Sequence, residues 1–316
     1  MHKAYQSFWE SVPVKRAMHP AFTDRGILGT TIESLKEPRR VISVIIPVLN
    51  EEAGIDPLRS KLKGLRDVFG QTADLEFVFV DDGSTDRTSE LLRSNFASSN
   101  RCQILTHDRN RGVGAAFRTG FAKATGSIVC SIDADCSYEP EGLKGLVDLI
   151  DAMGADIAVA SPYHPQGRVE AVPRWRLFVS RVCSMGYRLI SPVALYTYTS
   201  IFRAYRREVV MTVPFKADGF VSAAEILIRA SEMGYGIVEL PMTLHGRKAG
   251  TSKMRVAKTI RTHLRMMSGV VNRRAIQRLR SWFGGQQLSY RNTRTTLISG
   301  SVEPASTSAT GFGGKE

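Results

Sequence analysis

The stretch "RVISVIIPV", residues 40–48, decides the fold. Its apolar residues are branched and continuous and Pro47 closes the run, so they predict a strand that is buried on both faces. Strands that alternate with helices predict an α/β domain with a Rossmann-like, mostly parallel sheet and helices on both faces. Further strands are expected in 75–86, 102–107, 126–135 and 155–161, and helices over 51–70, 86–97 and 140–151, with another opened by the turn at 110–120.

The pattern continues less regularly after residue 165. We expect helices over 173–190 and 222–233, and short strands at 200–205 and 236–241. From Lys253 onward, apolar residues recur every three or four positions, which predicts C-terminal amphipathic helices. Ser84 or Thr85 is expected to cap the helix over 86–97.

These patterns divide the chain into four segments. We expect an N-terminal arm over 1–39, a catalytic domain over 40–250, a basic amphipathic helical segment over 251–283, and a disordered tail over 284–316. No apolar run reaches the roughly 18 residues that a membrane span needs, and the first twenty residues lack the apolar core of a secretory signal. We therefore expect a cytoplasmic protein without a transmembrane segment, and its four cysteines are expected to be reduced thiols.

Positive charge is concentrated near the C-terminus. The formal net charge is +13, and residues 245–302 contain many Lys and Arg but no Asp or Glu. Such a one-sided run indicates an anionic partner: phosphates, an acidic membrane surface or nucleic acid. Because the chain has no nucleic-acid recognition motif, we expect no nucleic acid among its partners.

Paired carboxylates follow the strand in 126–135. Asp133 and Asp135 stand on either side of Ala134 at its end. Aspartates in this arrangement can bind a hard divalent cation, Mg²⁺ or Mn²⁺, that bridges a diphosphate. A polar loop cap is the alternative, because this motif is frequent in loops.

Two further polar clusters end predicted strands. They are Asn50-Glu51 and Asp81-Asp82. Because ligands of such sheets bind at the carboxyl ends of the strands, we expect the three clusters to meet on one rim. Asp81-Asp82 suit hydrogen bonds to a base and a ribose, or a turn with a helix cap.

A glycine-rich turn and a basic segment complete the candidate motifs. "NRGVG", 110–114, lets the backbone approach a ligand, but it matches neither the P-loop nor the dinucleotide fingerprint. In "HGRKAGTSKMR", 245–255, Arg247 and Lys253 flank a turn that suits either a clamp on phosphate oxygens or a solvated loop.

Taken together, the motifs carry a family resemblance over about 41–256. "VIIPVLNEE", "VDDGSTD", "NRGVGAAFRTG" and "SIDAD" occur in the order and spacing of family 2 glycosyltransferases with the GT-A fold. Within that family, "GRKAGTSKMR" resembles the R-x-x-G-x-S-K motif of the dolichol-phosphate mannose synthase branch. The resemblance implies an inverting, metal-dependent transfer of a sugar, a mannose-like hexose being favoured, from a GDP- or UDP-linked donor to a polyprenyl phosphate.

The resemblance also implies roles for particular residues. Asp81 would hold the base or ribose, Asp133 and Asp135 the metal, and Arg176, together with Arg181, the acceptor phosphate. The residues implied to take part in transfer are Asp135, Arg176, Arg203, Arg247 and Lys253. The residues implied to bind the donor and its metal are Pro47, Leu49, Asn50, Glu51, Asp81, Asp82, Gly112, Asp133, Ala134 and Asp135.

Four positions depart from the pattern of that branch. Pro162 stands where an arginine is usual, Ser137 where a glutamine is common, and Thr197 and Ile201 replace an aspartate and a glycine. These departures leave the sugar and the acceptor open. The alternatives are transfer to a soluble glycan or small molecule, and a non-catalytic nucleotide-sugar-binding membrane protein.

The membrane is the expected location of the acceptor. The 253–283 segment combines apolar residues at helical spacing with many cations, which suits a helix lying in an anionic interface. We therefore expect a peripheral protein on the cytoplasmic face of a membrane. A C-terminal helix packed on the domain is the other interpretation.

Overall fold

The computed structural model describes residues 39–70, 72–246 and 256–283. The chain divides into two units, Met1–Asn272 and Arg273–Glu316, and the architecture below belongs to the first. The expected N-terminal arm and tail, and the two basic residues Arg247 and Lys253, lie outside the described residues.

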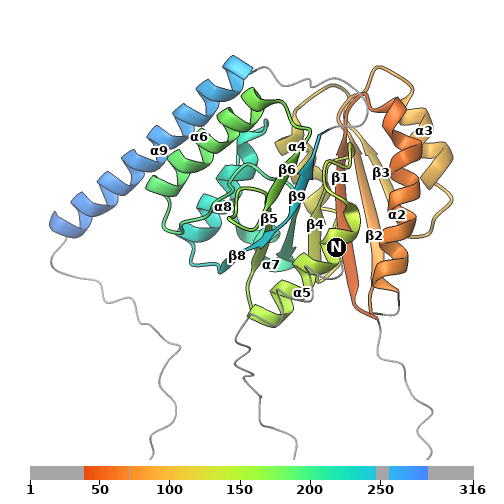
Figure 1. Cartoon of the computed structure of the whole chain (residues 1–316), viewed down its shortest axis with the longest axis horizontal. Coiled ribbons are helices and arrows are strands. Elements are labelled where there is room, and N and C mark those ends of the chain that lie inside the picture. The colour runs from red at the N-terminus through yellow and green to blue at the C-terminus, as the bar shows by residue number, and fades with distance from the viewer. Residues whose placement is uncertain (1–38, 71, 247–255, 284–316) are drawn as a thin grey trace, which may run out of the picture. The chain divides into compact units, whose positions relative to one another are not determined.

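A mixed sheet is the centre of the first unit (Figure 1). In the described part of the chain it has seven strands in the order β3-β2-β1-β4-β7-β5-β8, with β7 antiparallel to β4 and β5 and the other pairs parallel. Two short strands, β6 and β9, pair separately. The strands are β1 (Val41–Val48), β2 (Asp74–Asp81), β3 (Cys102–Thr106), β4 (Ile128–Ser131), β5 (Ile157–Ser161), β6 (Arg168–Glu170), β7 (Arg203–Arg206), β8 (Ile237–Pro241) and β9 (Thr243–His245).

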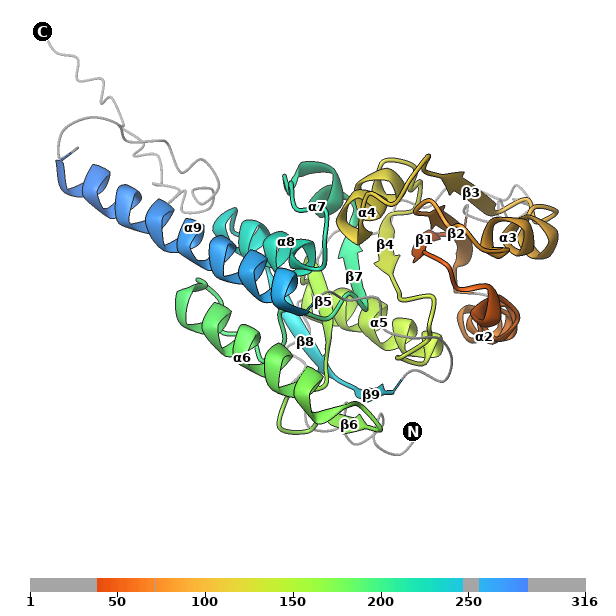
Figure 2. The same cartoon turned by 90° about the horizontal axis from the view of Figure 1, so that it is seen from above.

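Helices connect and cover the strands. Figure 2 shows α2 and α5 on one side of the sheet and α4, α7 and α8 on the other. The helices are η1 (Glu52–Gly54), α2 (Ile55–Phe69), α3 (Thr88–Phe96), α4 (Val113–Phe121), η2 (Pro140–Gly142), α5 (Leu143–Met153), α6 (Arg174–Ile190), α7 (Arg207–Thr212), α8 (Val221–Glu232) and α9 (Val256–Phe283). The predicted α/β architecture with a mostly parallel sheet is confirmed.

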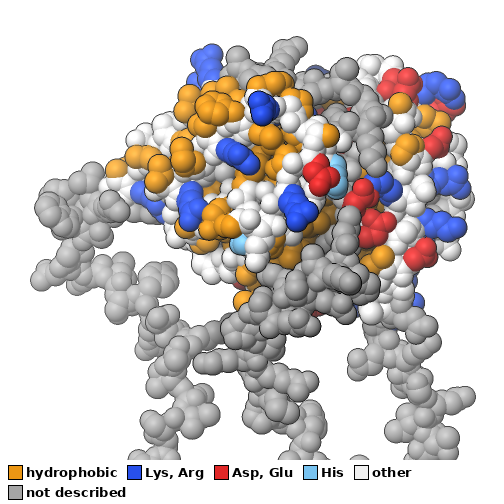
Figure 3. All heavy atoms as spheres, in the orientation of Figure 1, with side chains coloured by type: hydrophobic (Ala, Val, Ile, Leu, Met, Phe, Trp, Pro, Cys, Tyr) orange, Lys and Arg blue, Asp and Glu red, His pale blue; other side chains and the backbone are white. Residues whose placement is uncertain are grey.

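Helix α6 keeps apolar side chains at the surface. Trp175, Phe178, Met185 and Leu189 are all exposed. In the space-filling view, hydrophobic side chains mix with Lys and Arg over the area of α6 and α9 (Figure 3). Among the residues that the structure describes, none of the helices has both the length and the hydropathy that crossing a membrane requires.

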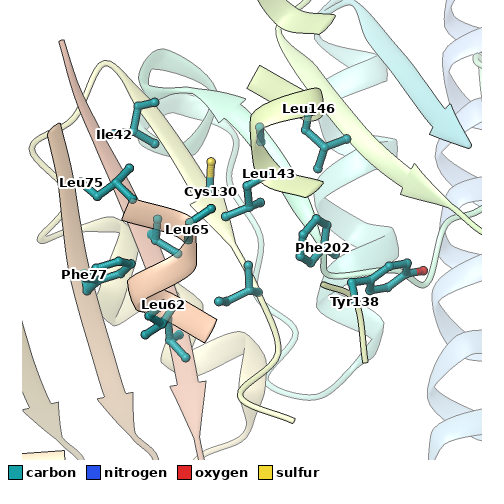
Figure 4. Close-up of a cluster of buried hydrophobic side chains, with 14 of the residues drawn as sticks. Ile42, Leu62, Leu65, Leu75, Phe77, Cys130, Tyr138, Leu143, Leu146 and Phe202 are labelled. Carbon is teal, nitrogen blue, oxygen red and sulfur yellow. The ribbon is translucent and has the colours of Figure 1, made fainter. Parts of the chain in front are cut away.

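Two hydrophobic layers hold the sheet between the helices. One layer packs α2, α3 and α5 against the sheet, with Leu62, Leu65 and Phe202 among its members (Figure 4). The other packs α4, α6 and α8 against the opposite face, with Phe117 and Tyr187 among its members. Strand β1 contributes to both layers because its residues alternate between the faces, which explains why its sequence is apolar throughout.

Some local expectations need correction. Helix α3 begins after Arg87, and the Asp86 carboxylate accepts a hydrogen bond from the amide of Thr88 at 3.0 Å, so the cap expected at Ser84 or Thr85 is wrong. Both of these side chains instead contact the loop after β1. Strands β6 and β9 and helix α7 were not predicted, because they are too short to show a period.

Strand order brings the polar clusters together. Strand β1 lies between β2 and β4, with Val48 paired to Asp81 and Ile45 paired to Ser131. All three strands are parallel, so the residues that follow each of them lie at one edge of the sheet.

Candidate functional site

A cavity of about 1120 Å³ opens at this edge of the sheet and extends toward α6 and α9. Loops after β1, β2 and β4 form one side of it. Nine of the residues predicted to take part in transfer or donor binding line it: Pro47, Leu49, Glu51, Asp82, Gly112, Asp133, Ala134, Asp135 and Arg176. The strand-end clusters therefore share one cavity with the first turn of α6.

The Asp133-Asp135 turn is tight and ordered by Ser137. One Asp135 carboxylate oxygen accepts hydrogen bonds from the amide and the hydroxyl of Ser137, at 2.9 and 2.8 Å. The amide of Cys136 donates to the carbonyl of Asp133 at 3.2 Å, and Cys136 has φ of 50°. Ser137, one of the departures from the family pattern, thus fixes the orientation of Asp135.

The donor atoms of this turn fit a hard cation in part. Two carboxylates face the cavity, and oxygen ligands are what Mg²⁺ and Mn²⁺ prefer. Burial raises the pKa of Cys136 to about 12, so its thiol stays protonated and offers no thiolate. Within the described ranges, no group of three His, Cys, Asp or Glu is arranged to hold a metal ion, so a bound cation would need further oxygens from its ligand.

Asp82 organises the glycine-rich turn. Its carboxylate accepts hydrogen bonds from the amides of Arg111 and Gly112, at 2.9 and 2.7 Å, and lies 2.7 Å from Nδ1 of His107. The other ring nitrogen of His107 lies 2.9 Å from the Thr119 hydroxyl. Asp82 therefore joins the end of β2 to the start of α4. His107 takes part in this contact, and no sequence motif indicated it.

Asp81 and Asn50 hold the neighbouring loops together. Asp81 is fully buried, and its carboxylate accepts hydrogen bonds from the Ser84 amide at 3.0 Å and from the Ser89 hydroxyl. Asn50 accepts a hydrogen bond from the amide of Thr85 at 2.6 Å. Neither residue is among those that line the cavity. The structure therefore places Asp81 as the cap of a turn, rather than toward a base or ribose.

Arg203 differs most from its expected place. It is fully buried in β7, and its guanidinium donates to the carbonyls of Ala223 and Tyr198 at 2.6 and 2.9 Å. It does not line the cavity, so the expected contact with donor phosphates is replaced by a bridge between β7 and α8. The sequence could not show this, because an arginine in a short strand reads as a surface residue.

Other cations line the cavity in the described part of the chain. Arg176 lies in the first turn of α6, and Arg111, Lys216 and Arg265 also contribute. Arg111 belongs to the glycine-rich turn, so the sequence motif could have indicated it as a site residue. No sequence motif indicated Lys216 as a site residue, because it lies in an irregular loop before α8. Arg181 is exposed and stacks over the ring of Tyr163 at 5.3 Å, outside the cavity lining.

Glu225 lines the cavity but is engaged by the backbone. Its carboxylate accepts hydrogen bonds from the amides of Lys216 and Ala217, at 3.1 and 2.8 Å. The same loop packs against the glycine-rich turn, where the carbonyl of Asp218 accepts a hydrogen bond from Gly114 at 2.6 Å. Glu225 thus positions the loop before α8.

The far end of the cavity lies between α6 and α9. His263 of α9 is 4% exposed, and its Nδ1 lies 2.7 Å from the hydroxyl of Tyr187 of α6. Burial lowers the pKa of His263 to about 4, so the ring is neutral near pH 7. Burial also raises the pKa of Tyr187, which therefore keeps its proton.

The remaining departures lie along one wall. Pro162 lines the cavity, and the Thr197 hydroxyl lies 2.9 Å from that of Ser161. Glu239 accepts hydrogen bonds from the amides of Tyr196 and Thr197, at 2.8 and 2.9 Å. These contacts fix the loop before β7 without a charged side chain at position 197.

Most of this region matches a known protein family. The model of "Glycosyl transferase family 2" matches residues 43–213. The polyprenol monophosphomannose synthase of Mycolicibacterium smegmatis is 33% identical over 224 residues, which cover 69% of this chain and 82% of that protein. The dolichol-phosphate mannosyltransferase of Pyrococcus furiosus is 34% identical over 245 residues, which cover 77% of this chain.

A third relative carries a different sugar in its name. The undecaprenyl-phosphate 4-deoxy-4-formamido-L-arabinose transferase of Pseudomonas paraeruginosa is 32% identical over 212 residues, or 63% of this chain. The match spans 64% of the Pyrococcus protein and 60% of the Pseudomonas protein, so these two extend well beyond the shared region.

Solved structures show the same fold. Glucosyl-3-phosphoglycerate synthase from Mycobacterium tuberculosis, in complex with Mn²⁺, UDP and glucosyl-3-phosphoglycerate, superposes with a TM-score of 0.56 at 22% identity. The superposition covers 73% of this chain and 80% of that chain. At this identity the likeness establishes the GT-A-like architecture alone.

Proposed function

The chain belongs to glycosyl transferase family 2, and on this premise we propose that it transfers a sugar from a nucleotide diphosphate to a polyprenyl phosphate. One observation carries the proposal: Asp82, Asp133, Asp135 and Arg176 line a single cavity. Paired carboxylates and a nearby cation suit a reaction between two phosphorylated substrates. The names of the relatives, each of which includes a polyprenol, a dolichol phosphate or an undecaprenyl phosphate, support a lipid acceptor.

The donor is proposed to bind beside β1 and β2. Pro47, Leu49, Glu51 and Gly112 line this part of the cavity, with Asp82 beneath the glycine-rich turn. Asn50 and Asp81 hold the two loops in place from behind. The donor is a GDP- or UDP-linked hexose in this proposal, a mannose-like sugar being favoured.

Asp133 and Asp135 would hold Mg²⁺ or Mn²⁺, with Ala134 between them at the cavity wall. A bound divalent ion supplies positive charge that stabilises the departing diphosphate. Arg247 and Lys253 remain proposed contacts of the donor phosphates, and they lie outside the described residues.

The acceptor phosphate is proposed to bind at Arg176. A phosphate oxygen of the acceptor attacks the anomeric carbon, the bond from that carbon to the diphosphate oxygen breaks, and the nucleoside diphosphate leaves with the electron pair. Such a displacement inverts the anomeric configuration, and an anionic nucleophile needs no general base. Glu225 lines the cavity, but its carboxylate accepts hydrogen bonds from two backbone amides, so it positions a loop and is not needed as a base. Holding both anions in line supplies much of the rate enhancement.

A direct assay tests the proposal. Purified protein with Mn²⁺, a panel of GDP- and UDP-linked hexoses and a short polyprenyl phosphate is expected to form a lipid-linked sugar, detected by mass spectrometry. Omission of the metal with a chelator is expected to abolish the product. Absence of product with every donor, although a nucleotide sugar raises the melting temperature, would contradict transfer to a polyprenyl phosphate.

A soluble acceptor is the second candidate. Pro162 lines the cavity at a position where the resemblance expects an arginine, so a phosphate contact is missing there. Product formed with a water-soluble glycan or phosphorylated small molecule, and none with the polyprenyl phosphate, would favour this candidate.

We also propose that the reaction takes place at an anionic, cytoplasmic membrane surface. A polyprenyl chain stays in the bilayer, so the protein must meet its acceptor there. The one-sided positive charge after residue 245 supports this location.

A further inference from the structure

Helix α6 has two faces of different composition. One face lines the cavity with Arg176, Val179, Ser180 and Cys183. Phe178, Arg181 and Val182 lie between these positions, point the other way on the helix and are exposed. The helix therefore separates the cavity from the molecular surface, and it buries only Cys183, Ser184 and Tyr187.

The outer face is an apolar stripe. Its members are Trp175, Phe178, Val182, Met185 and Leu189, which are 48%, 69%, 45%, 61% and 81% exposed. Their spacings alternate between three and four residues, so they form one continuous row about 21 Å long. Exposed apolar residues are common singly, but a row of this length on one helix marks an interaction surface.

A row of arginines accompanies the stripe. Arg174, Arg181 and Arg188 follow each other two helical turns apart, which places them along one border of the stripe. All three are exposed, and α6 contains no Asp or Glu. An apolar row bordered by cations is the pattern of a helix that lies in the plane of an anionic bilayer surface.

Helix α9 extends the same surface. The two helices pack through Tyr187 and His263, and Gly186 admits the side chain of Met267. On α9, Leu264 is 61% exposed, and Val271 is 48% exposed. Arg261 and Arg265 are exposed on the same helix.

We propose that the outer face of α6, extended by α9, is the surface that docks on an anionic lipid bilayer. Charge complementarity selects the bilayer over a second copy of the chain, because two copies would bring the arginine rows of both together. The opposite face of α6 lines the cavity, so docking places the cavity one helix away from the lipid surface. This assignment rests on the proposed function, since a polyprenyl phosphate is the substrate that would need such an arrangement.

Vesicle flotation tests the assignment. The full chain is mixed with vesicles of phosphatidylcholine and phosphatidylglycerol that contain no polyprenyl phosphate, so binding is measured whether or not sugar transfer occurs. We expect binding that weakens with salt and with omission of phosphatidylglycerol. The double variant Phe178→Ser and Leu189→Ser is expected to bind at least tenfold more weakly, because each change removes an apolar anchor from the lipid.

A matched control separates position from hydrophobicity. Met153 and Met211 are 53% and 55% exposed on α5 and α7, away from the stripe. The double variant Met153→Ser and Met211→Ser is expected to bind vesicles as the unchanged protein does. Equal losses in the two double variants, or none in the stripe variant, would overturn the assignment.

A second readout leaves the stripe intact. In a variant with Trp9→Phe and Trp282→Phe, Trp175 is the remaining tryptophan. Brominated lipids are expected to quench its fluorescence on binding, and unquenched Trp175 in the vesicle-bound protein would overturn the proposal. A dimer in light scattering that dissociates in the stripe variant, without vesicle binding by the unchanged protein, would assign the face to a second copy instead.

Discussion

At the scale of the residue, three strand-end aspartates have three different environments. Asp81 is buried under a turn, Asp82 is bonded to two amides at the cavity wall, and Asp135 faces the cavity with its orientation set by Ser137. An aspartate thus caps a turn, holds a neighbouring loop in place or faces the cavity as a candidate ligand, depending on the hydrogen-bond donors around it. Asp135, together with Asp133, is the proposed ligand of the cation.

Asp135→Asn is expected to lower kcat/KM for sugar transfer about a thousandfold, because an amide provides one neutral ligand oxygen in place of a charged carboxylate. Initial rates at several Mn²⁺ concentrations measure the effect. Asp108→Asn, which changes an exposed carboxylate just after β3, is the control and should retain activity. Full activity of the Asp135 variant would refute a role for this carboxylate.

His263 gives the stability a defined pH dependence. Burial holds its pKa at about 4 in the folded protein, against an ordinary value of 6.5. As the pH falls below 6.5, the unfolded chain takes up a proton and the folded chain does not, so stability is lost down to about pH 4. We expect this single group to remove on the order of 2–3 kcal/mol over that range.

His263→Gln is expected to reduce this loss while it keeps a hydrogen-bonding partner for Tyr187. Urea unfolding at pH 6.5, 5.5 and 4.5 compares the two proteins. Parallel curves of stability against pH would show that the buried imidazole is not responsible.

At the scale of the element, the glycine-rich turn lets the start of α4 pack closely against the 216–218 loop. Gly112 has φ of 97°, and a Cβ on Gly112 or Gly114 would collide with the backbone of Asp218 or Ala217. The turn and the 216–218 loop therefore approach as bare backbones, and Asp82 binds the turn from the other side. Helix α4 begins where these contacts place it.

Gly114→Ala is expected to cost about 1–3 kcal/mol of stability, because the added methyl group must displace the carbonyl of Ala217. We also expect a raised KM for the donor, since the turn borders the cavity. Gly219→Ala in the same loop is the control, as its Cβ would meet nothing within 4 Å. Thermal unfolding and donor titration measure both effects, and equal stabilities of the two variants would contradict the packing role.

At the scale of the whole molecule, the two hydrophobic layers keep the strand ends in register. Leu65 is fully buried in the layer shown in Figure 4, on the same helix as the exposed Val68. Leu65→Ala is expected to cost about 2–5 kcal/mol, whereas Val68→Ala should change stability by less than about 0.5 kcal/mol. Denaturant unfolding tests the difference. KM values unchanged in both variants are expected, because neither residue lines the cavity.

The sequence by itself determined the elements and the rim of the site. Continuous apolar strands, the helices between them and polar residues at three strand ends are local patterns, and local patterns are readable from a linear chain. They predicted the sheet and the positions of Asp82, Asp133 and Asp135 at one edge. Nine of the residues predicted to take part in transfer or donor binding line the cavity, and eight of these lie at the end of a strand or in the loop that follows it.

Tertiary structure decided what each side chain does once the elements meet. It places Arg203 in the core as a donor to carbonyls of α8 and of the loop before β7, makes Asp81 the cap of a turn, and brings His263 of α9 to Tyr187 of α6. It also leaves the outer face of α6 uncovered, although the sequence predicted only that residues 173–190 form a helix. The physical reason is that burial and partners arise between segments far apart in the chain, where no local periodicity records them.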